Sequence, residues 1–291
     1  MRRFFDFVEN FIFFYRFQIT NLRKINSIRY IWYIIINFQN KQIKKMKTKW
    51  DYSERAATYD KRADYSSEAI DELLDILDCK KDQVIADIGA GTGKLSIPLL
   101  MRGHNVICVE PNNNMRNIGI QNTKNFKVNW VEGTGENTNM KDSSVNYAFF
   151  GSSFNVLNQE KTLKETKRIL KNNGSFACMW NHRDLNDITQ KEIENIIKQY
   201  IPNYNYGKRR EDPTDVIRES KIFDNIRSIQ KYFVVKMRTE DIISAWKSHE
   251  TLSRQSGKNF EKIISDIYNF LQPKDYFEVP YMTKIWCADL T

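Results

Sequence analysis

A glycine-rich turn that follows a short apolar run is the part of the sequence best suited to bind a ligand. Val84–Ile88 is apolar enough for a buried strand, the letters D-I-G-A-G-T-G occupy positions 87–93, and a helical pattern starts at Lys94. Glycines let a backbone approach a ligand closely, and the open N–H groups of a helix start favour a nearby anionic group. The order of strand, turn and helix therefore predicts a nucleotide-binding turn.

Spacing excludes two common phosphate-binding motifs at this turn. A GxxxxGK[ST] loop ending at Gly93 and Lys94 would need glycine at position 88 and serine or threonine at 95, where the chain has Ile88 and Leu95. A GxGxxG dinucleotide motif starting at Gly89 would need glycine at position 94, and the long side chain of Lys94 opposes close packing of the helix on the strand. The turn fits neither motif, although its place in the chain still indicates a nucleotide.

The next strand pattern, Val106–Val109, ends on an acidic residue. Glu110 and Pro111 follow it directly. A carboxylate in this position can accept hydrogen bonds from both hydroxyl groups of a ribose, a geometry that a 2′-phosphate would repel. Glu110 is therefore predicted to bind the ribose of the ligand.

Alternating helical and strand patterns from about residue 66 would position these residues. Such alternation is typical of a parallel sheet covered by helices on both faces, with the carboxyl ends of its strands at one edge. Residues 172–174, Asn-Asn-Gly, are expected to separate a helix from the strand after it. The predicted strands are Val84–Ile88, Val106–Val109, Phe126–Val131, Val145–Phe150, Ser175–Trp180, Lys231–Met237 and Tyr276–Leu290, and the predicted helices are Ser67–Leu77, Lys94–Met101, Asn113–Gln121, Gln159–Leu170, Asp187–Tyr200, Glu240–His249 and Phe260–Leu271.

The D-x-G-x-G-x-G pattern at 87–93, followed by Glu110 after the next strand, resembles the first two motifs of class I methyltransferases that use S-adenosylmethionine. The resemblance covers about residues 51–291. It implies an α/β fold with a Rossmann-like seven-stranded, mostly parallel sheet sandwiched by helices, and a helical cap from C-terminal insertions. It also implies S-adenosyl-L-methionine as cofactor and S-adenosyl-L-homocysteine as product, with contacts from Asp87, Gly89, Gly91, Gly93, Glu110 and Pro111.

A third element of the same family follows the strand pattern that ends at Val131. The letters E-G-T-G-E-N at 132–137 are similar to the family's E-G-[DN]-A-E, with a threonine where relatives carry an acidic residue that contacts the adenine. The resemblance implies cofactor contacts from Thr134, Gly135 and Glu136. It also implies that the loop beginning near Gly151 closes the cofactor site and faces the substrate.

Within this family the chain resembles the small-molecule branch that includes the trans-aconitate enzymes and type-11-like relatives. Residues 53–65 are similar to a segment that covers the cofactor in relatives, with Ala63 in place of the usual proline. The resemblance implies that Tyr59, Arg62 and Tyr65 meet the methionine end of the cofactor, and that Arg62 pairs with its carboxylate.

Two further stretches support this branch. Where relatives carry His-Trp after the fourth strand, this chain has Asn155 and Val156, and positions 180–184 resemble the branch's W-N-x-R-D. The resemblance places these residues at the carboxyl edge of the sheet, where open α/β folds bind ligands. The predicted substrate-binding residues are Tyr65, Asn155, Trp180, Asn181, Arg183 and Trp246.

Methyl transfer from a sulfonium is an in-line displacement with a good leaving group, so positioning and exclusion of water should supply most of the catalysis. We therefore expect no obligatory catalytic base, and name Asn155 and His182 as the candidate catalytic residues. The acceptor is a small molecule carrying a carboxylate, amine or hydroxyl. Arg183, Arg209 and Arg210 favour an anionic acceptor, although the last two equally fit solvated loop residues.

The excess of basic over acidic residues lies in the first fifty residues. The chain has 291 residues and a net charge of +9, and residues 1–50 hold eleven basic and two acidic residues, so residues 51–291 are balanced. We predict an extension at 1–45 and a methyltransferase domain at 46–291, with a cofactor-binding core at about 66–182 and substrate-cap segments at about 200–272. The extension has no uncharged run long enough to span a bilayer, and three interpretations stay open: an interfacial anchor, an extra packing element, or a stretch foreign to the natural protein.

Other function classes fit less well. Two observations argue against a nucleic-acid methyltransferase: residues 51–291 are balanced in charge, and no Asn/Asp-Pro-Pro-aromatic motif follows the fourth strand. A nucleic-acid methyltransferase remains an alternative, as does a non-catalytic cofactor-binding protein. Four separated cysteines and three histidines show no metal-ligand spacing, so no metal is predicted. We expect reduced thiols, a cytoplasmic protein and no membrane partner outside residues 1–45.

Overall fold

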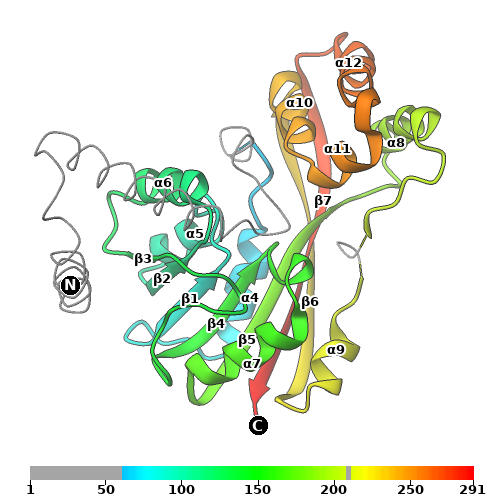
Figure 1. The fold of residues 1–291 in the computed structure, drawn as a ribbon. Helices are drawn as coiled ribbons and strands as arrows, with labels where there is room; N and C mark the ends of the chain where they lie inside the picture. Colours follow the sequence, from blue (N-terminus) through cyan, green and yellow to red (C-terminus); the bar gives the residue numbers. More distant parts are fainter. Residues whose placement is uncertain (1–60, 208–210) are drawn as a thin grey trace, which may run out of the picture. The chain divides into compact units, whose positions relative to one another are not determined.

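A seven-stranded sheet organises the part of the chain that the computed structural model describes, residues 61–207 and 211–291 (Figure 1). The chain divides into two units, Met1–Lys49 and Trp50–Thr291, and every described residue lies in the second. The strands are β1 (Val84–Ile88), β2 (Asn105–Val109), β3 (Asn129–Val131), β4 (Val145–Gly151), β5 (Leu170–Arg183), β6 (Phe223–Arg238) and β7 (Tyr276–Leu290).

The strand order is β3-β2-β1-β4-β5-β7-β6. Strands β1 to β5 pair in parallel with their neighbours, whereas β7 is antiparallel to both β5 and β6. The order reverses between β1 and β4, where an open α/β sheet leaves a crevice at the carboxyl ends of its strands. The predicted α/β fold with a seven-stranded, mostly parallel sheet is confirmed.

Helices cover both faces of the sheet because successive strand residues point to opposite sides. Tyr147 and Phe149 of β4 pack with α4 (Ser67–Ile76) and α5 (Ser96–Met101), whereas Ala148 and Phe150 pack with α7 (Gln159–Ile169) and α9 (Thr214–Glu219). Helix α6 (Asn113–Asn122) lies against β3 through Gly119, where a side chain would collide with Trp130.

A third hydrophobic cluster holds a helical cap beyond the end of the sheet. The cap contains α8 (Ile188–Tyr200), α10 (Thr239–Lys247), α11 (Glu250–Ser256) and α12 (Phe260–Leu271). Strands β6 and β7 remain paired as far as Arg238 and Tyr276, and the cap helices gather around this extension (Figure 1). Its core includes Trp246, Ile264 and Val279, each 3% exposed or less.

Several predicted boundaries differ from the structure. Strand β3 starts at Asn129 rather than Phe126, β6 begins at Phe223, and helices α9 and α11 come from segments without a predicted helix. Residues 172–174 do not separate α7 from β5 but belong to β5. A register shift opposite β4, with Asn173 at φ 61°, absorbs the turn-forming letters as a bulge.

The cap segments also differ from the expected range of about 200–272. The cap begins earlier, with α8, while α9 and the first half of β6 pack against the sheet and α7. Alternating exposure along β6 explains why the sequence was ambiguous there, because an edge strand with one solvated face carries polar residues at every second position. None of the described helices is long and apolar enough to cross a membrane.

Candidate functional site

A cleft lies at the carboxyl ends of β1, β4 and β5, between the sheet and the cap. It holds about 1090 Å³ of empty space, including open solvent at its mouth. The cleft brings together eleven residues predicted from the sequence: Arg62, Tyr65, Asp87, Gly89, Gly91, Gly151, Asn155, Trp180, Asn181, His182 and Arg183.

The glycine turn after β1 has a backbone that other residues would strain. Gly89, Gly91 and Gly93 have φ values of 72°, 59° and 91°, a region that L side chains rarely adopt. A Cβ atom on Gly89 would also lie 2.5 Å from Cβ of Ser153, whose hydroxyl donates to the Ile88 carbonyl at 2.5 Å. The amides of Gly89 and Ala90 both donate to the Val109 carbonyl, so the turn is fixed to the end of β2.

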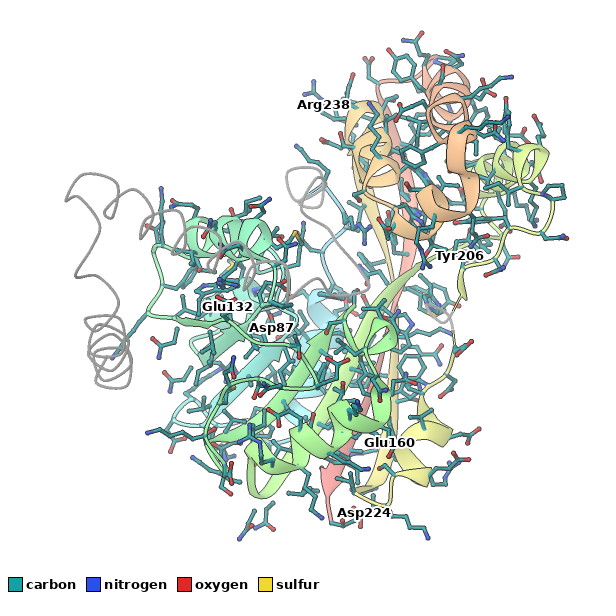
Figure 2. The ribbon with its side chains drawn as sticks, in the orientation of Figure 1. Asp87, Glu132, Glu160, Tyr206, Asp224 and Arg238 are labelled. Carbon is teal, nitrogen blue, oxygen red and sulfur yellow. The ribbon has the colours of Figure 1, made fainter. Side chains whose placement is uncertain are left out.

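Asp87 is a completely buried carboxylate at the base of this turn (Figure 2). The Ser96 hydroxyl donates to Oδ2 at 2.5 Å, whereas Oδ1 has no hydrogen-bond partner among the described residues. Burial raises the pKa of Asp87 from 3.8 to about 7, helped by the Glu110 charge and opposed by the bond from Ser96. A buried acceptor without a donor is costly, so the cleft wall is suited to a ligand that supplies one.

Glu110 ties the glycine turn to the segment after β2. Its Oε2 accepts from the Gly91 amide at 2.9 Å and its Oε1 from the Asn112 amide at 2.8 Å. Burial raises the pKa of Glu110, while the two amides and Arg116 oppose that rise. Glu110 and Pro111 stand beside the cleft rather than in its lining, but each carboxylate oxygen retains a second lone pair for a ribose hydroxyl.

The predicted adenine-contacting residues also lie outside the cleft lining. Thr134 and Asn137 close a tight turn, in which Oγ1 of Thr134 accepts from the Asn137 amide at 3.1 Å. Glu136 accepts from the Asn158 amide at 2.8 Å, and a Cβ on Gly135 would collide with Leu157. Thr134, Gly135 and Glu136 therefore stabilise the loop after β3. Gly93 shapes the glycine turn at 87–93, also without lining the cleft.

Residues 61–65 cross between the sheet and the cap. Arg62 donates to Oγ of Ser248 at 2.8 Å and to its carbonyl at 2.6 Å, so the guanidinium expected to pair with a cofactor carboxylate is bound to the end of α10. Asn181 donates to the Asp64 carbonyl at 2.8 Å, and the Tyr65 hydroxyl lies 2.9 Å from that of Ser152. Tyr59 lies outside the described residues.

The predicted substrate residues on β5 are held by β7 and by the cap. Trp180 stacks on Trp286 with ring centroids 4.7 Å apart, and Asn181 accepts from the Thr283 hydroxyl at 2.6 Å. The Arg183 guanidinium lies 4.1 Å above the ring of Trp246. Trp246 is 2% exposed and therefore supports Arg183 from behind instead of lining the cleft.

The two candidate catalytic residues both line the cleft, on different elements. Asn155 lies in the short helix η3 (Phe154–Val156) after β4, is 6% exposed, and its Oδ1 has no partner in the part of the chain that is described. His182 lies near the end of β5, with its ring centroid 6.5 Å from that of Trp180.

Eight lining residues are not among the predicted site residues: Ala63, Ala90, Lys94, Leu95, Ser152, Tyr206, His249 and Tyr281. Tyr281 is the register partner of Arg183 across β5 and β7, so the pairing of the two strands could have revealed it. His249 stands just before α11 and Tyr206 lies in an irregular segment, where periodicity gives no signal. Arg209 and Arg210 are outside the described residues.

Comparison with known proteins agrees with this geometry. Residues 86–178 match the family described as "Methyltransferase domain". An uncharacterized methyltransferase of Mycobacterium tuberculosis is 30% identical over 123 residues, 42% of this chain and 48% of that protein. A fission yeast (Schizosaccharomyces pombe) uncharacterized methyltransferase is 28% identical over the same length. The chain thus spans about half the length of the curated relatives it matches.

Solved structures share the fold at low identity. A methyltransferase from an antibiotic biosynthesis pathway of Anabaena variabilis superposes with a TM-score of 0.52, at 18% identity over 74% of this chain and 96% of that one. Phosphoethanolamine N-methyltransferase 2 of Haemonchus contortus, solved with S-adenosyl-L-methionine, gives 0.50 at 15% identity over 84% and 58%. The resemblance to class I S-adenosylmethionine-dependent methyltransferases is confirmed.

Proposed function

We propose that this chain, a class I S-adenosylmethionine-dependent methyltransferase by its domain and fold, transfers a methyl group to a small-molecule acceptor held under its cap. The observation that carries the proposal is the cleft at the strand order reversal, where the positive-φ glycine turn meets the buried Asp87 carboxylate. Ligands of open α/β sheets bind at this place. The small size of the acceptor is supported by the enclosure of the cleft between sheet, cap and residues 61–65.

The residues present fit the cofactor of this class. The unpartnered Oδ1 of Asp87 is suited to an ammonium donor, and Gly89 and Gly91 line the cleft with backbone alone. Glu110 would hold ribose hydroxyls through its remaining lone pairs. Pro111, Thr134, Gly135 and Glu136 would shape the adjoining loops. S-adenosyl-L-methionine supplies an electrophilic methyl group on a sulfonium.

The chain's own part in catalysis is to position the acceptor and to exclude water. Asn155 and His182 would orient the acceptor, while Trp180, Asn181 and Arg183 form the wall of β5 beside it. Because the leaving group is already good, placement near the methyl carbon supplies most of the effect and no general base is required. Carboxylate, amine and hydroxyl acceptors all remain compatible with this part of the proposal.

The proposal extends to domain limits and location. We assign residues 46–291 to the methyltransferase domain and 1–45 to an extension without an assigned role. A cytoplasmic location is supported by four cysteines that are all free thiols, three of them buried.

Titration calorimetry of S-adenosyl-L-homocysteine into the full-length chain tests the proposal. We expect micromolar binding that weakens about tenfold or more in Glu110→Ala, because charge-assisted hydrogen bonds contribute about 1.5–3 kcal/mol. Glu160→Ala removes an exposed carboxylate of α7 and should leave affinity unchanged. Since Glu110 also accepts two backbone amides, a thermal melt must show that the variant is folded. Absence of binding by folded wild-type protein would refute the proposed function.

A further inference from the structure

Two residues in the wall of the cleft each bury a polar atom that forms no hydrogen bond with the described part of the chain. Trp180 is 3% exposed and holds an unpaired Nε1, and Asn155 is 6% exposed and holds an unpaired Oδ1. Buried polar atoms are nearly always hydrogen-bonded in folded proteins, because an unmet donor or acceptor loses its bonds to water without replacement. The two atoms are therefore suited to a ligand that supplies both partners.

Asn155 and Trp180 lie on the same side of the sheet. Gly151 of β4 pairs with Met179 of β5, so Trp180 stands one position beyond this pair, and η3 begins three residues after Gly151. Phe154, the neighbour of Asn155, belongs to the same hydrophobic cluster as Trp180. The register of two adjacent strands thus brings the unpaired donor and the unpaired acceptor to one part of the cleft wall.

Aromatic packing holds both residues in place. The ring of Trp180 stacks on Trp286 of β7, with centroids 4.7 Å apart and an interplanar angle of 30°. The short helix that carries Asn155 is anchored by Phe154, whose ring lies 5.1 Å from that of Phe176 between centroids. A ligand at this place meets residues whose backbone and rings are already ordered, so less ordering opposes its binding.

The unpaired Oδ1 of Asp87, which the proposed function assigns to the cofactor, lies on the other side of the sheet. Ala86 and Ile88 of β1 belong to the same cluster as Trp180, and successive strand residues point to opposite faces, so Asp87 faces away from that cluster. Asn155 and Trp180 are therefore separate from the group that would hold the cofactor ammonium.

The two unpaired atoms have complementary hydrogen-bonding characters. The indole N–H of Trp180 can only donate, and Oδ1 of Asn155 can only accept. A carboxylate offers acceptors alone and an ammonium offers donors alone, so each would leave one of the two buried atoms unmet, and each would also lose its hydration. A carboxamide or a hydroxyl offers a donor and an acceptor together and carries no charge.

We propose that Asn155 and Trp180 are specificity-determining residues that bind an uncharged carboxamide or hydroxyl group of the acceptor. The N–H or O–H of that group donates to Oδ1 of Asn155, and its oxygen accepts from Nε1 of Trp180. Acceptors that lack either function are disfavoured, because a buried polar atom of the site then stays unpaired. This inference rests on the proposed function and names the acceptor class for the same cleft.

Three variants separate hydrogen bonding from packing. Trp180→Phe removes the N–H and keeps an aromatic ring beside Trp286. Trp286→Phe is the matched control, since it disturbs the same stack but lies outside the cleft lining and leaves the Trp180 N–H in place. Asn155→Leu removes the acceptor and keeps a side chain of similar size.

The indole proton of Trp180 can be observed directly. In full-length protein labelled with ¹⁵N-tryptophan and saturated with S-adenosyl-L-homocysteine, its resonance is the one among six that is lost in Trp180→Phe, and the others report whether each variant is folded. Benzamide should move this resonance downfield as the hydrogen bond forms, in wild type and in Trp286→Phe. A resonance that stays in place at saturating benzamide would overturn the proposal.

Calorimetry at saturating S-adenosyl-L-homocysteine measures the contribution of each atom. Acetophenone has the shape of benzamide but carries a methyl group in place of NH₂, so wild type should bind benzamide about tenfold more tightly. Asn155→Leu should abolish this preference, whereas Trp180→Phe should weaken both probes about threefold to tenfold. Trp286→Phe should leave the preference unchanged.

Charged probes complete the test. Benzoate and benzylamine should both bind more weakly than benzamide, and the tighter of benzamide and benzyl alcohol identifies the recognised group. A preference for benzamide over acetophenone that survives Asn155→Leu, tightest binding of a charged probe, or no binding of any uncharged probe would overturn the inference. Because S-adenosyl-L-homocysteine binding is measured first, its failure would identify the proposed function as the error.

Discussion

The two ends of the cleft differ in the groups that form them, backbone at one end and side chains at the other. The end beside β1 is formed by backbone, with the turn at 87–93 and Glu110 joined through amide hydrogen bonds over a short stretch of chain. The cap end is formed by side chains, with Arg183, Tyr206, His249 and Tyr281 brought together by aromatic packing across long sequence distances. Backbone geometry tolerates few substitutions, whereas packed side chains can be exchanged. The first end is thus suited to a constant ligand and the second to a variable one.

The largest expected effect tests whether the two ends are independent. Trp246→Ala would empty a buried site in the cap core and remove the surface under Arg183, with a loss of about 3–5 kcal/mol in the free energy of unfolding. Affinity for S-adenosyl-L-homocysteine should change less than threefold, because the turn at 87–93 touches none of the cap core. Urea denaturation and calorimetry measure the two quantities. A tenfold loss of affinity in folded variant protein would show that the ends are coupled.

A second prediction tests the backbone end. Gly89→Ala would force a side chain into a φ of 72° and within 2.5 Å of Ser153, so we expect about 1–3 kcal/mol of destabilisation and at least a tenfold loss of S-adenosyl-L-homocysteine affinity. Gly207→Ala is the matched control, since its φ is also positive, at 56°, but no atom lies within 4 Å of the added Cβ. Equal effects of the two variants on affinity would remove the close approach at Gly89 from the argument.

The same difference explains what the sequence could predict. Turn chemistry and the end of a strand are local properties, so positions 87–93, Glu110 and the carboxyl edge of the sheet followed from a few adjacent letters. The contacts that cleft residues make with distant parts of the chain did not follow from adjacent letters. Arg62 bonds to Ser248 across 186 positions, and His249 lines the cleft together with residues of β5 that are far from it in the sequence. Periodicity carries no information on such contacts.

The ends of two strands were also set by pairing with distant strands rather than by local sequence. The expected stop at 172–174 became a bulge in β5, because Leu170 pairs with Val145 of β4 before these residues and Ser175 pairs with Tyr147 after them. The start of β6 at Phe223, well before the predicted Lys231, was equally hidden, because polar residues alternate along this edge strand. Sheet pairing, which joins distant segments, overrode local preference in both cases.

A third prediction uses the titration of Asp87. Burial raises its pKa to about 7, so the folded state prefers the proton, and stability should fall as pH rises from about 4 through 7. A ligand ammonium beside Oδ1 needs the ionised form, so S-adenosyl-L-homocysteine affinity should rise about tenfold between pH 6 and pH 8. Asp87→Asn should flatten both profiles. Thermal melts and calorimetry across this range provide the test, and an affinity that falls with pH would place the ammonium elsewhere.

The smallest expected effect concerns the segment that joins the two ends. Ser248→Ala removes the Oγ that accepts from Nε of Arg62 but leaves the Ser248 carbonyl, which accepts from the same guanidinium. Losing this bond should cost about 0.5–1.5 kcal/mol and speed S-adenosyl-L-homocysteine release about threefold in stopped-flow measurements. Ser265→Ala, on α12 in a separate groove, is the control. If release is unchanged while the melting temperature falls, Arg62 stabilises the cap without restraining the ligand, and the two ends of the cleft share no working connection through residues 61–65.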